Sequence, residues 1–133
     1  MPRILVIDDD TSVRNTITIV LQAKGFEVAT AANGREGLAQ IAAGQFDAVI
    51  LDIFMPEMDG LEAIRCIREH SATLPIIAVS GGMSLFEYRD APEAPAPDFL
   101  DMATKLGAIT AVPKPFKPRD LVAALDTLMR KAA

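Results

Sequence analysis

Aromatic, histidine and cysteine residues are scarce in this sequence. It contains no tryptophan and only one tyrosine, one histidine and one cysteine among 133 residues. Cys66 cannot form an internal disulfide, and its place in a helical pattern predicts a small buried apolar side chain rather than a reactive thiol. The chain is long enough to bury a real core, and we expect one domain covering residues 1–133.

Basic residues are outnumbered. The 13 lysines and arginines face 18 aspartates and glutamates, for a formal net charge of −5. Nucleic-acid binding relies on clustered basic side chains and no basic stripe is visible, so we expect no direct nucleic-acid partner. We expect no second domain that could bind DNA or catalyse a reaction. The domain is therefore expected to act through surface contacts with another protein.

Long hydrophobic runs are absent. The longest apolar runs have the length of strands, so no segment is expected to span a bilayer and no membrane partner is predicted. No charged leader with an apolar stretch precedes the first strand-like run, which begins almost at once. This pattern favours a cytoplasmic location.

Short apolar runs alternate with helical periodicity along the whole chain, and half of the residues are hydrophobic. The predicted strands are Ile4–Ile7, Phe26–Thr30, Ala48–Leu51, Ile76–Val79 and Ile109–Val112, each followed by a predicted helix. Such alternation is typical of βαβ units with right-handed crossovers. It predicts an α/β fold, a doubly wound, five-stranded parallel sheet of the flavodoxin-like type, with the strand order 2-1-3-4-5.

Four of the predicted strands end on a residue suited to phosphate chemistry. The first ends on three consecutive aspartates, the third on Asp52, the fourth on Ser80 and the fifth on Lys114. In a parallel sheet the carboxyl ends of the strands share one edge, and ligands bind in the crevice there. The predicted switch point lies between strands 1 and 3, the two strands that end on aspartates.

Each of these residues also has a simpler structural interpretation. An aspartate before a helix is often only a cap, but Asp8, Asp9 and Asp10 exceed what capping needs. Like charges about 4 Å apart repel by roughly 4 kcal/mol at an effective dielectric of 20, so clustering them calls for a cation or for protonation. We therefore expect Asp8 and Asp9 to hold a metal, whereas Asp10 is the better candidate for capping or for solvation.

The three residues that end the other strands also have simpler structural roles. Asp52 could merely bond the loop that follows it, and Ser80 could start a turn with Gly81 and Gly82. Lys114 could be one more surface lysine, although the prolines on both sides of it fix its backbone. Taken together, carboxylates, a hydroxyl and an ammonium suit phosphoryl transfer with Mg²⁺, in which a carboxylate forms an aspartyl phosphate.

Four segments in this order, ILVIDDD, DAVILDIFMPEMDG, PIIAVSG and PKPF, resemble the response-regulator receiver domain, the phosphoacceptor module of two-component signalling. With no output domain, the chain is similar to the single-domain, chemotaxis-type members. The resemblance implies that the protein is a phosphoprotein of a phosphorelay rather than an enzyme. Its phosphoryl donor would be a phosphohistidine on a sensor histidine kinase or a histidine phosphotransfer protein.

The resemblance also implies a role for each site residue. Asp52 would be the phosphoacceptor and would bind Mg²⁺ together with Asp9 and the backbone carbonyl of Phe54. Asp8 would help to hold the metal, partly through water. Ser80 would bond the phosphoryl group and shift inward, and Lys114 would pair with that group. Phosphorylation would then switch the surface formed by helix 4, strand 5 and helix 5 toward an unknown downstream protein or a homodimer.

Two features depart from the family pattern. Ala111 stands where members carry an aromatic residue that swings inward on activation. The loop between strand 4 and helix 4, at about 81–97, is extended and rich in alanine and proline; Phe86 and Tyr88 lie in it and could replace the missing aromatic. Phe54, which flanks the phosphoryl site, cannot orient an attacking water, which predicts slow self-dephosphorylation.

Three other functions are possible for this fold. A phosphohydrolase with an aspartate nucleophile would carry a second aspartate two residues after it, where Phe54 stands. A flavin-binding protein would need a phosphate loop after the first strand, where this chain has acidic residues. The third is a phosphorylation-independent interaction module with a receiver-like fold. The intact acidic pair, Asp8 and Asp9, argues against it, although Ala111 leaves room for it.

Overall fold

The computed structural model describes residues 2–52, 60–80, 110–113 and 118–132. Its elements, in chain order, are β1 (Arg3–Ile7), α1 (Thr11–Ala23), β2 (Glu27–Ala31), α2 (Gly34–Ala43), β3 (Ala48–Asp52), α3 (Gly60–His70), β4 (Ile76–Ser80), β5 (Thr110–Pro113) and α6 (Pro118–Ala132). The predicted loop at about 81–97 and the helix predicted after it lie outside the described residues. The last predicted helix corresponds to α6.

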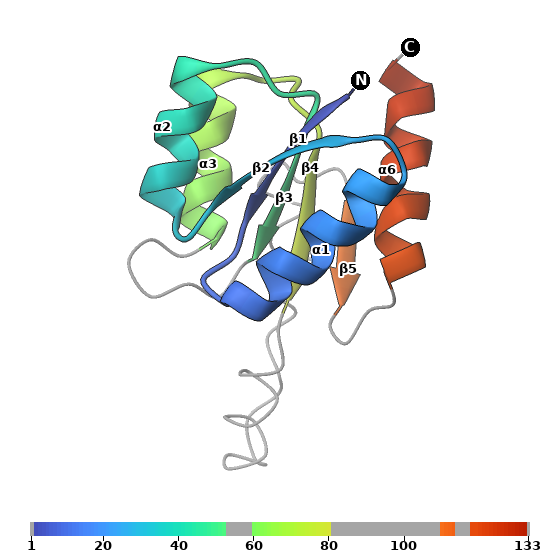
Figure 1. Ribbon diagram of the computed structural model, residues 1–133. Coiled ribbons are helices and arrows are strands. Elements are labelled where there is room, and N and C mark those ends of the chain that lie inside the picture. Colours follow the sequence, from blue (N-terminus) through green and yellow to red (C-terminus); the bar gives the residue numbers. More distant parts are fainter. Residues whose placement is uncertain (1, 53–59, 81–109, 114–117, 133) are drawn as a thin grey trace, which may run out of the picture.

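The strands form one parallel sheet in the order β2-β1-β3-β4-β5, which confirms the predicted fold. In Figure 1 the strand arrows run toward one side of the molecule, where α1 also begins. All five residues of β3 are buried, as expected for a central strand covered on both faces. By contrast, β2 is largely exposed or half-buried, which agrees with its predicted place at the edge.

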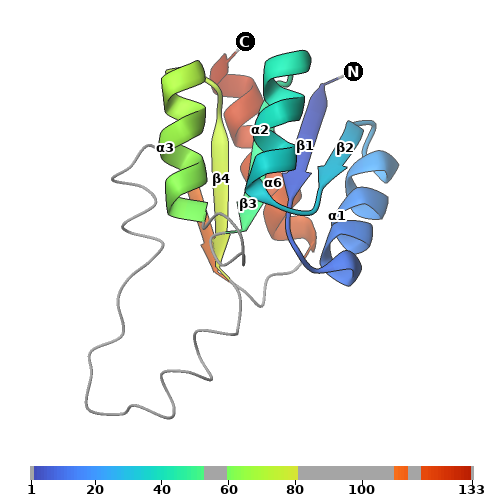
Figure 2. The same cartoon turned by 90° about the vertical axis from the view of Figure 1, so that its left-hand side faces the viewer.

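Helices cover both faces of the sheet and divide the core into two layers. Helices α2 and α3 pack on one face, and α1 and α6 pack on the other. Figure 2 shows α2 and α3 in front of the strands and α6 behind them. The first layer includes Ile41, Ile64 and Ile67, and the second includes Leu21 and Leu125. Burying each such side chain contributes roughly 1.5–3 kcal/mol.

Two further sequence expectations concern α3 and the membrane. Cys66 on α3 is a free cysteine but is only partly buried, so the prediction of a buried side chain is wrong. None of the helices in the described part of the chain combines the length and apolarity that crossing a membrane requires.

Helix α1 begins directly after the run of three aspartates. Its N-cap is Asp10, whose carboxylate accepts hydrogen bonds from the first-turn amides, and Thr11 and Ser12 already lie inside the helix. The helix ends in a Schellman motif, in which the Phe26 amide donates to the Leu21 carbonyl. Gly25, the only residue with positive φ among those described, adopts φ +92° there, as a glycine readily does.

Helix α2 is fixed by side-chain hydrogen bonds at its N-terminus and by a close contact with β1. The Asn33 side chain accepts from the Glu36 amide, and the Glu36 carboxylate accepts from the Ala32 amide. One turn further on, a Cβ added at Gly37 would lie 2.3 Å from Ile7 Cδ1. The helix can therefore approach the end of β1 this closely only because residue 37 has no side chain.

We expect Gly37→Ala to destabilise the protein by about 1–3 kcal/mol, because the new methyl overlaps a buried isoleucine. At an open helix position the same change would stabilise by up to about 1 kcal/mol, so the sign of the effect is diagnostic. Urea unfolding followed by circular dichroism measures it. In an Ile7→Val background, which removes the Cδ1 methyl, the cost of Gly37→Ala should shrink; an equal cost in both backgrounds would contradict the contact.

Candidate functional site

The candidate site lies where β1 and β3 end, at the switch point of the sheet. These strands are neighbours, with Ile7 opposite Leu51, so the next residues, Asp8 and Asp52, emerge side by side. Both carboxylates are nearly inaccessible, with Asp8 1% and Asp52 4% exposed. They are the two polar or charged residues found buried in the described part of the chain. Buried ionisable groups need partners, and both of these have them.

A third carboxylate completes the cluster. Asp8, Asp9 and Asp52 can each offer an oxygen such that the three oxygens lie within 4.8 Å of one another. Asp9 is exposed, whereas the other two are buried, so the cluster has one face open to solvent. Carboxylate oxygens are the ligands that hard divalent cations prefer, and the donor set present therefore fits such an ion.

Asp10, the third aspartate of the run, has a different task. Its Oδ1 accepts from the Ser12 amide at 2.8 Å and from the Val13 amide at 3.4 Å, so its carboxylate caps α1. Its own amide donates to Oδ1 of Asp8 at 2.9 Å. The preference for Asp10 as a capping residue is confirmed, and one turn both starts the helix and orients a carboxylate of the cluster.

The sequence interpretation missed Arg14. Its Nη1 donates to the backbone carbonyl of Asp8 at 2.6 Å, and its Nη2 donates to Oγ1 of Thr11 at 3.1 Å. The available signal was its position four residues after the helix cap, where a side chain lies above the first turn. Nothing in the residue pattern indicated that the guanidinium would turn back toward the strand.

The backbone brings one further predicted site position, Ser80, to the same edge as the cluster. Asp52 pairs with Val79, so Ser80 follows at the same edge of the sheet, and Ser80 pairs with Pro113 of β5. Phe54 and Lys114 lie outside the described residues. The side chains of Ser80 and Ala111 are likewise not described, and their roles remain predictions.

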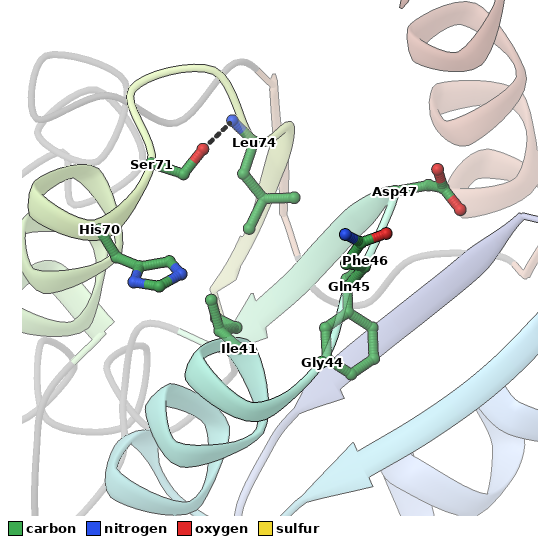
Figure 3. Close-up of a pocket in the computed structure, with 8 residues that line it drawn as sticks. All are labelled: Ile41, Gly44, Gln45, Phe46, Asp47, His70, Ser71 and Leu74. Carbon is green, nitrogen blue, oxygen red and sulfur yellow. Dashed lines mark hydrogen bonds between the residues drawn. The ribbon is translucent and has the colours of Figure 1, made fainter.

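A pocket of about 280 Å³ lies at the opposite edge of the sheet, between the ends of α2 and α3. Figure 3 shows its lining residues, which are Ile41, Gly44, Gln45, Phe46, Asp47, His70, Ser71 and Leu74. Several polar groups around it serve the fold. Asp47 accepts from the Arg3 amide, and the Ser71 hydroxyl accepts from the Leu74 amide.

Arg68 stabilises the turn between α3 and β4, which borders this pocket. Its Nη1 donates to the carbonyls of Ser71 and Leu74 at 3.2 and 2.7 Å, and burial lowers the pKa of its guanidinium. The corner between α3 and β4 is thus held by a partly desolvated cation. The acidic cluster lies at the other end of the strands, and we assign no chemistry to the pocket.

Comparison with known proteins points to one family. A family model described as the response regulator receiver domain matches residues 4–126. The chain is 38% identical over 129 residues to "Response regulator MprA" of Mycolicibacterium vanbaalenii, covering 97% of this chain and 51% of that protein. The same-named protein of Mycobacterium avium is 36% identical over 129 residues, with the same coverages. The chain spans about half the length of these curated relatives.

Solved structures agree with that match. The chemotaxis protein CheY4 of Vibrio cholerae superposes with a TM-score of 0.80 at 32% identity, covering 96% of this chain and 98% of that one. The response regulator TrrA of Thermotoga maritima, solved in complex with Mg(2+)-BeF, gives a TM-score of 0.77 at 34% identity, with coverages of 96% and 99%.

The geometry predicts different effects of neutralising two adjacent aspartates. Asp9→Asn removes a charge from the cluster, so without metal it should raise the melting temperature by relieving repulsion. We expect a divalent cation to raise the melting temperature of the wild-type protein, and Asp9→Asn should abolish that rise. Asp10→Asn keeps the capping oxygen and should retain that rise.

Thermal unfolding with MgCl₂ or with EDTA measures both effects. Equal responses to the cation in the two variants would contradict the separation of ligand from cap.

Proposed function

Because the chain belongs to the response regulator receiver domain family, we propose that it is a phosphoacceptor switch whose acceptor is Asp52. The observation that carries the proposal is the meeting of Asp8, Asp9 and Asp52 at the switch point of the sheet. The donor would be a phosphohistidine of a sensor histidine kinase or of a histidine phosphotransfer protein. The protein would act in the cytoplasm as a signalling domain of a two-component system and not as an enzyme.

The proposed transfer begins with Asp52. One of its carboxylate oxygens attacks phosphorus, the bond from phosphorus to the histidine nitrogen breaks, and that nitrogen keeps the electron pair. The product is an aspartyl phosphate. Because Asp52 closes a fully buried strand, its carboxylate has little freedom, and its position is already set when the donor arrives.

Mg²⁺ is the proposed cofactor, and it would neutralise the charge of the transferring group. Asp9, Asp52 and the carbonyl of Phe54 would hold it, with Asp8 in support. The identity of the ion is supported by the carboxylate donor set and by the similarity to TrrA, a protein solved with Mg(2+)-BeF. Ser80 would bond the transferred phosphoryl group, and the ammonium of Lys114 would pair with its oxygens.

The output is proposed to leave through the surface that includes β5 and α6, toward a downstream protein or a second copy of the chain. Ala111, on β5 opposite Ala78, has only a methyl group and cannot act as an aromatic switch. This residue is the specific observation that favours the second candidate, a phosphorylation-independent interaction module. The two candidates differ in whether Asp52 accepts a phosphoryl group.

Intact mass spectrometry after incubation with acetyl phosphate or phosphoramidate tests the acceptor. With Mg²⁺ we expect one phosphoryl group on the wild-type protein and none on Asp52→Ala. Asp126→Ala, which removes an exposed carboxylate from α6, is the matched control and should be modified like the wild type. An adduct that survives Asp52→Ala would assign the acceptor to another residue and sink the role of Asp52. No adduct in the wild type would favour the interaction module.

The lifetime of the phosphorylated form is a separate prediction. Phe54 offers no polar group that could orient a hydrolytic water, so self-dephosphorylation should be slow. Phe54→Asn should shorten the lifetime several-fold, measured as loss of the adduct after the small-molecule donor is removed. A lifetime of seconds in the wild type that Phe54→Asn leaves unchanged would count against this interpretation.

A further inference from the structure

Arg14 is tied to the turn that carries two of the three clustered carboxylates. It lies in the second turn of α1 and is half-buried. One guanidinium nitrogen donates to the Asp8 carbonyl at 2.6 Å and the other to the Thr11 hydroxyl at 3.1 Å. Figure 1 shows the chain leaving β1 and entering α1 on the side of the molecule toward which the strands run, and the clustered carboxylates lie at that edge of the sheet.

The Asp8 carbonyl is a consequential acceptor, because it belongs to the peptide that leads into Asp9. A peptide unit is planar, so fixing the carbonyl also fixes the direction in which the Asp9 backbone begins. The other groups of Asp8 are held as well. Its amide donates to the Ala31 carbonyl at 3.2 Å, and its Oδ1 accepts from the Asp10 amide at 2.9 Å. Arg14 supplies the restraint on the remaining backbone group.

Asp9 differs from its two neighbours in the cluster. Asp8 and Asp52 are packed into the protein, whereas Asp9 is exposed. Its carboxylate must nevertheless lie with the other two if one ion is to contact all three, and an exposed side chain depends on its backbone for placement. We propose that Arg14, through its two-pronged hydrogen bonding, is a positioning residue that places Asp9 for the divalent cation. This inference rests on the proposed function of the cluster.

The charge of Arg14 and its positioning role have opposite effects on cation affinity. The direction in which the affinity changes when Arg14 is replaced therefore tests the proposal. A guanidinium near the cluster repels a cation, so its removal by charge alone would tighten cation binding. Loss of the restraint on the Asp8 carbonyl would instead weaken cation binding. A lysine keeps the charge, but its ammonium is a compact point donor that lacks the planar fork reaching both acceptors.

The experiment is a titration of the ¹⁵N-labelled full chain with MgCl₂, followed by amide chemical shifts. We expect Arg14→Met and Arg14→Lys to raise the Kd for Mg²⁺ by about tenfold, within the usual cost of losing a residue that orients a metal ligand. Arg65→Met, which removes the same charge from an exposed position on α3, is the control and should leave the Kd unchanged. Tighter or unchanged binding in Arg14→Met, or wild-type affinity in Arg14→Lys, would overturn the proposal.

A metal-free measurement separates positioning from general stability. In Arg14→Met the Asp10 amide, which donates to Asp8, should exchange with solvent faster, while Ile77 in β4 keeps its wild-type exchange rate. Uniformly faster exchange would indicate a purely structural role. If Arg14→Met does not fold, Thr11→Val removes only the second acceptor and should weaken Mg²⁺ binding to a smaller degree; an unchanged Kd would overturn the proposed fork.

Failure of this inference is distinct from failure of the proposed function. If the wild type binds Mg²⁺ and Asp52 is phosphorylated, but the Arg14 variants match the wild type, only the role of Arg14 falls. If the wild type neither binds Mg²⁺ nor accepts a phosphoryl group, the proposed function of the cluster falls as well.

Discussion

Mutual repulsion among three carboxylates is the constraint to which the rest of this structure responds. Two unit charges about 4 Å apart repel by roughly 4 kcal/mol at an effective dielectric of 20. Asp8 and Asp52 also lose nearly all their contact with water. Burial of one large apolar side chain contributes only about 1.5–3 kcal/mol, so several must be packed well to offset one such pair. The densely apolar β1, β3 and β4 provide that packing next to the charges.

The two edges of the sheet differ in how their charged groups are arranged. At the amino edge, charges are matched locally: Arg3 lies over the Phe46 ring at 4.7 Å, and its amide bonds Asp47. Arg68 satisfies carbonyls of the neighbouring turn. At the carboxyl edge, by contrast, charges of one sign converge. The contacts at the amino edge therefore stabilise the fold, whereas the clustered carboxylates at the carboxyl edge destabilise it.

The sequence predicted the strand order and the approach of Asp8 and Asp52 because both follow from periodicity and parallel topology. It favoured Asp10 as the cap of α1, although three successive aspartates offer similar local caps. In the structure the Asp8 carboxylate accepts from the Asp10 amide at the sheet's edge, and the capping role falls to Asp10.

Contacts that form only when the elements pack together could not be predicted from the sequence. The guanidinium of Arg14 meets the Asp8 carbonyl because the chain reverses between strand and helix, and no spacing rule encodes that reversal. The same holds for Gly37, whose missing side chain matters only once α2 lies against β1. The roles of Ser80, Lys114, Phe54 and Ala111 stay predictions, because they depend on side chains outside the described residues.

The contact between Gly37 and Ile7 has a mechanical consequence. Ile7 directly precedes Asp8, and only the Ile7 side chain lies between β1 and the α2 backbone at Gly37. Close-packed interiors transmit displacement instead of absorbing it. The tip of β1 and the middle of α2 therefore behave as one stiff body, and a displacement of Ile7 toward the helix has to be accommodated by α2 itself.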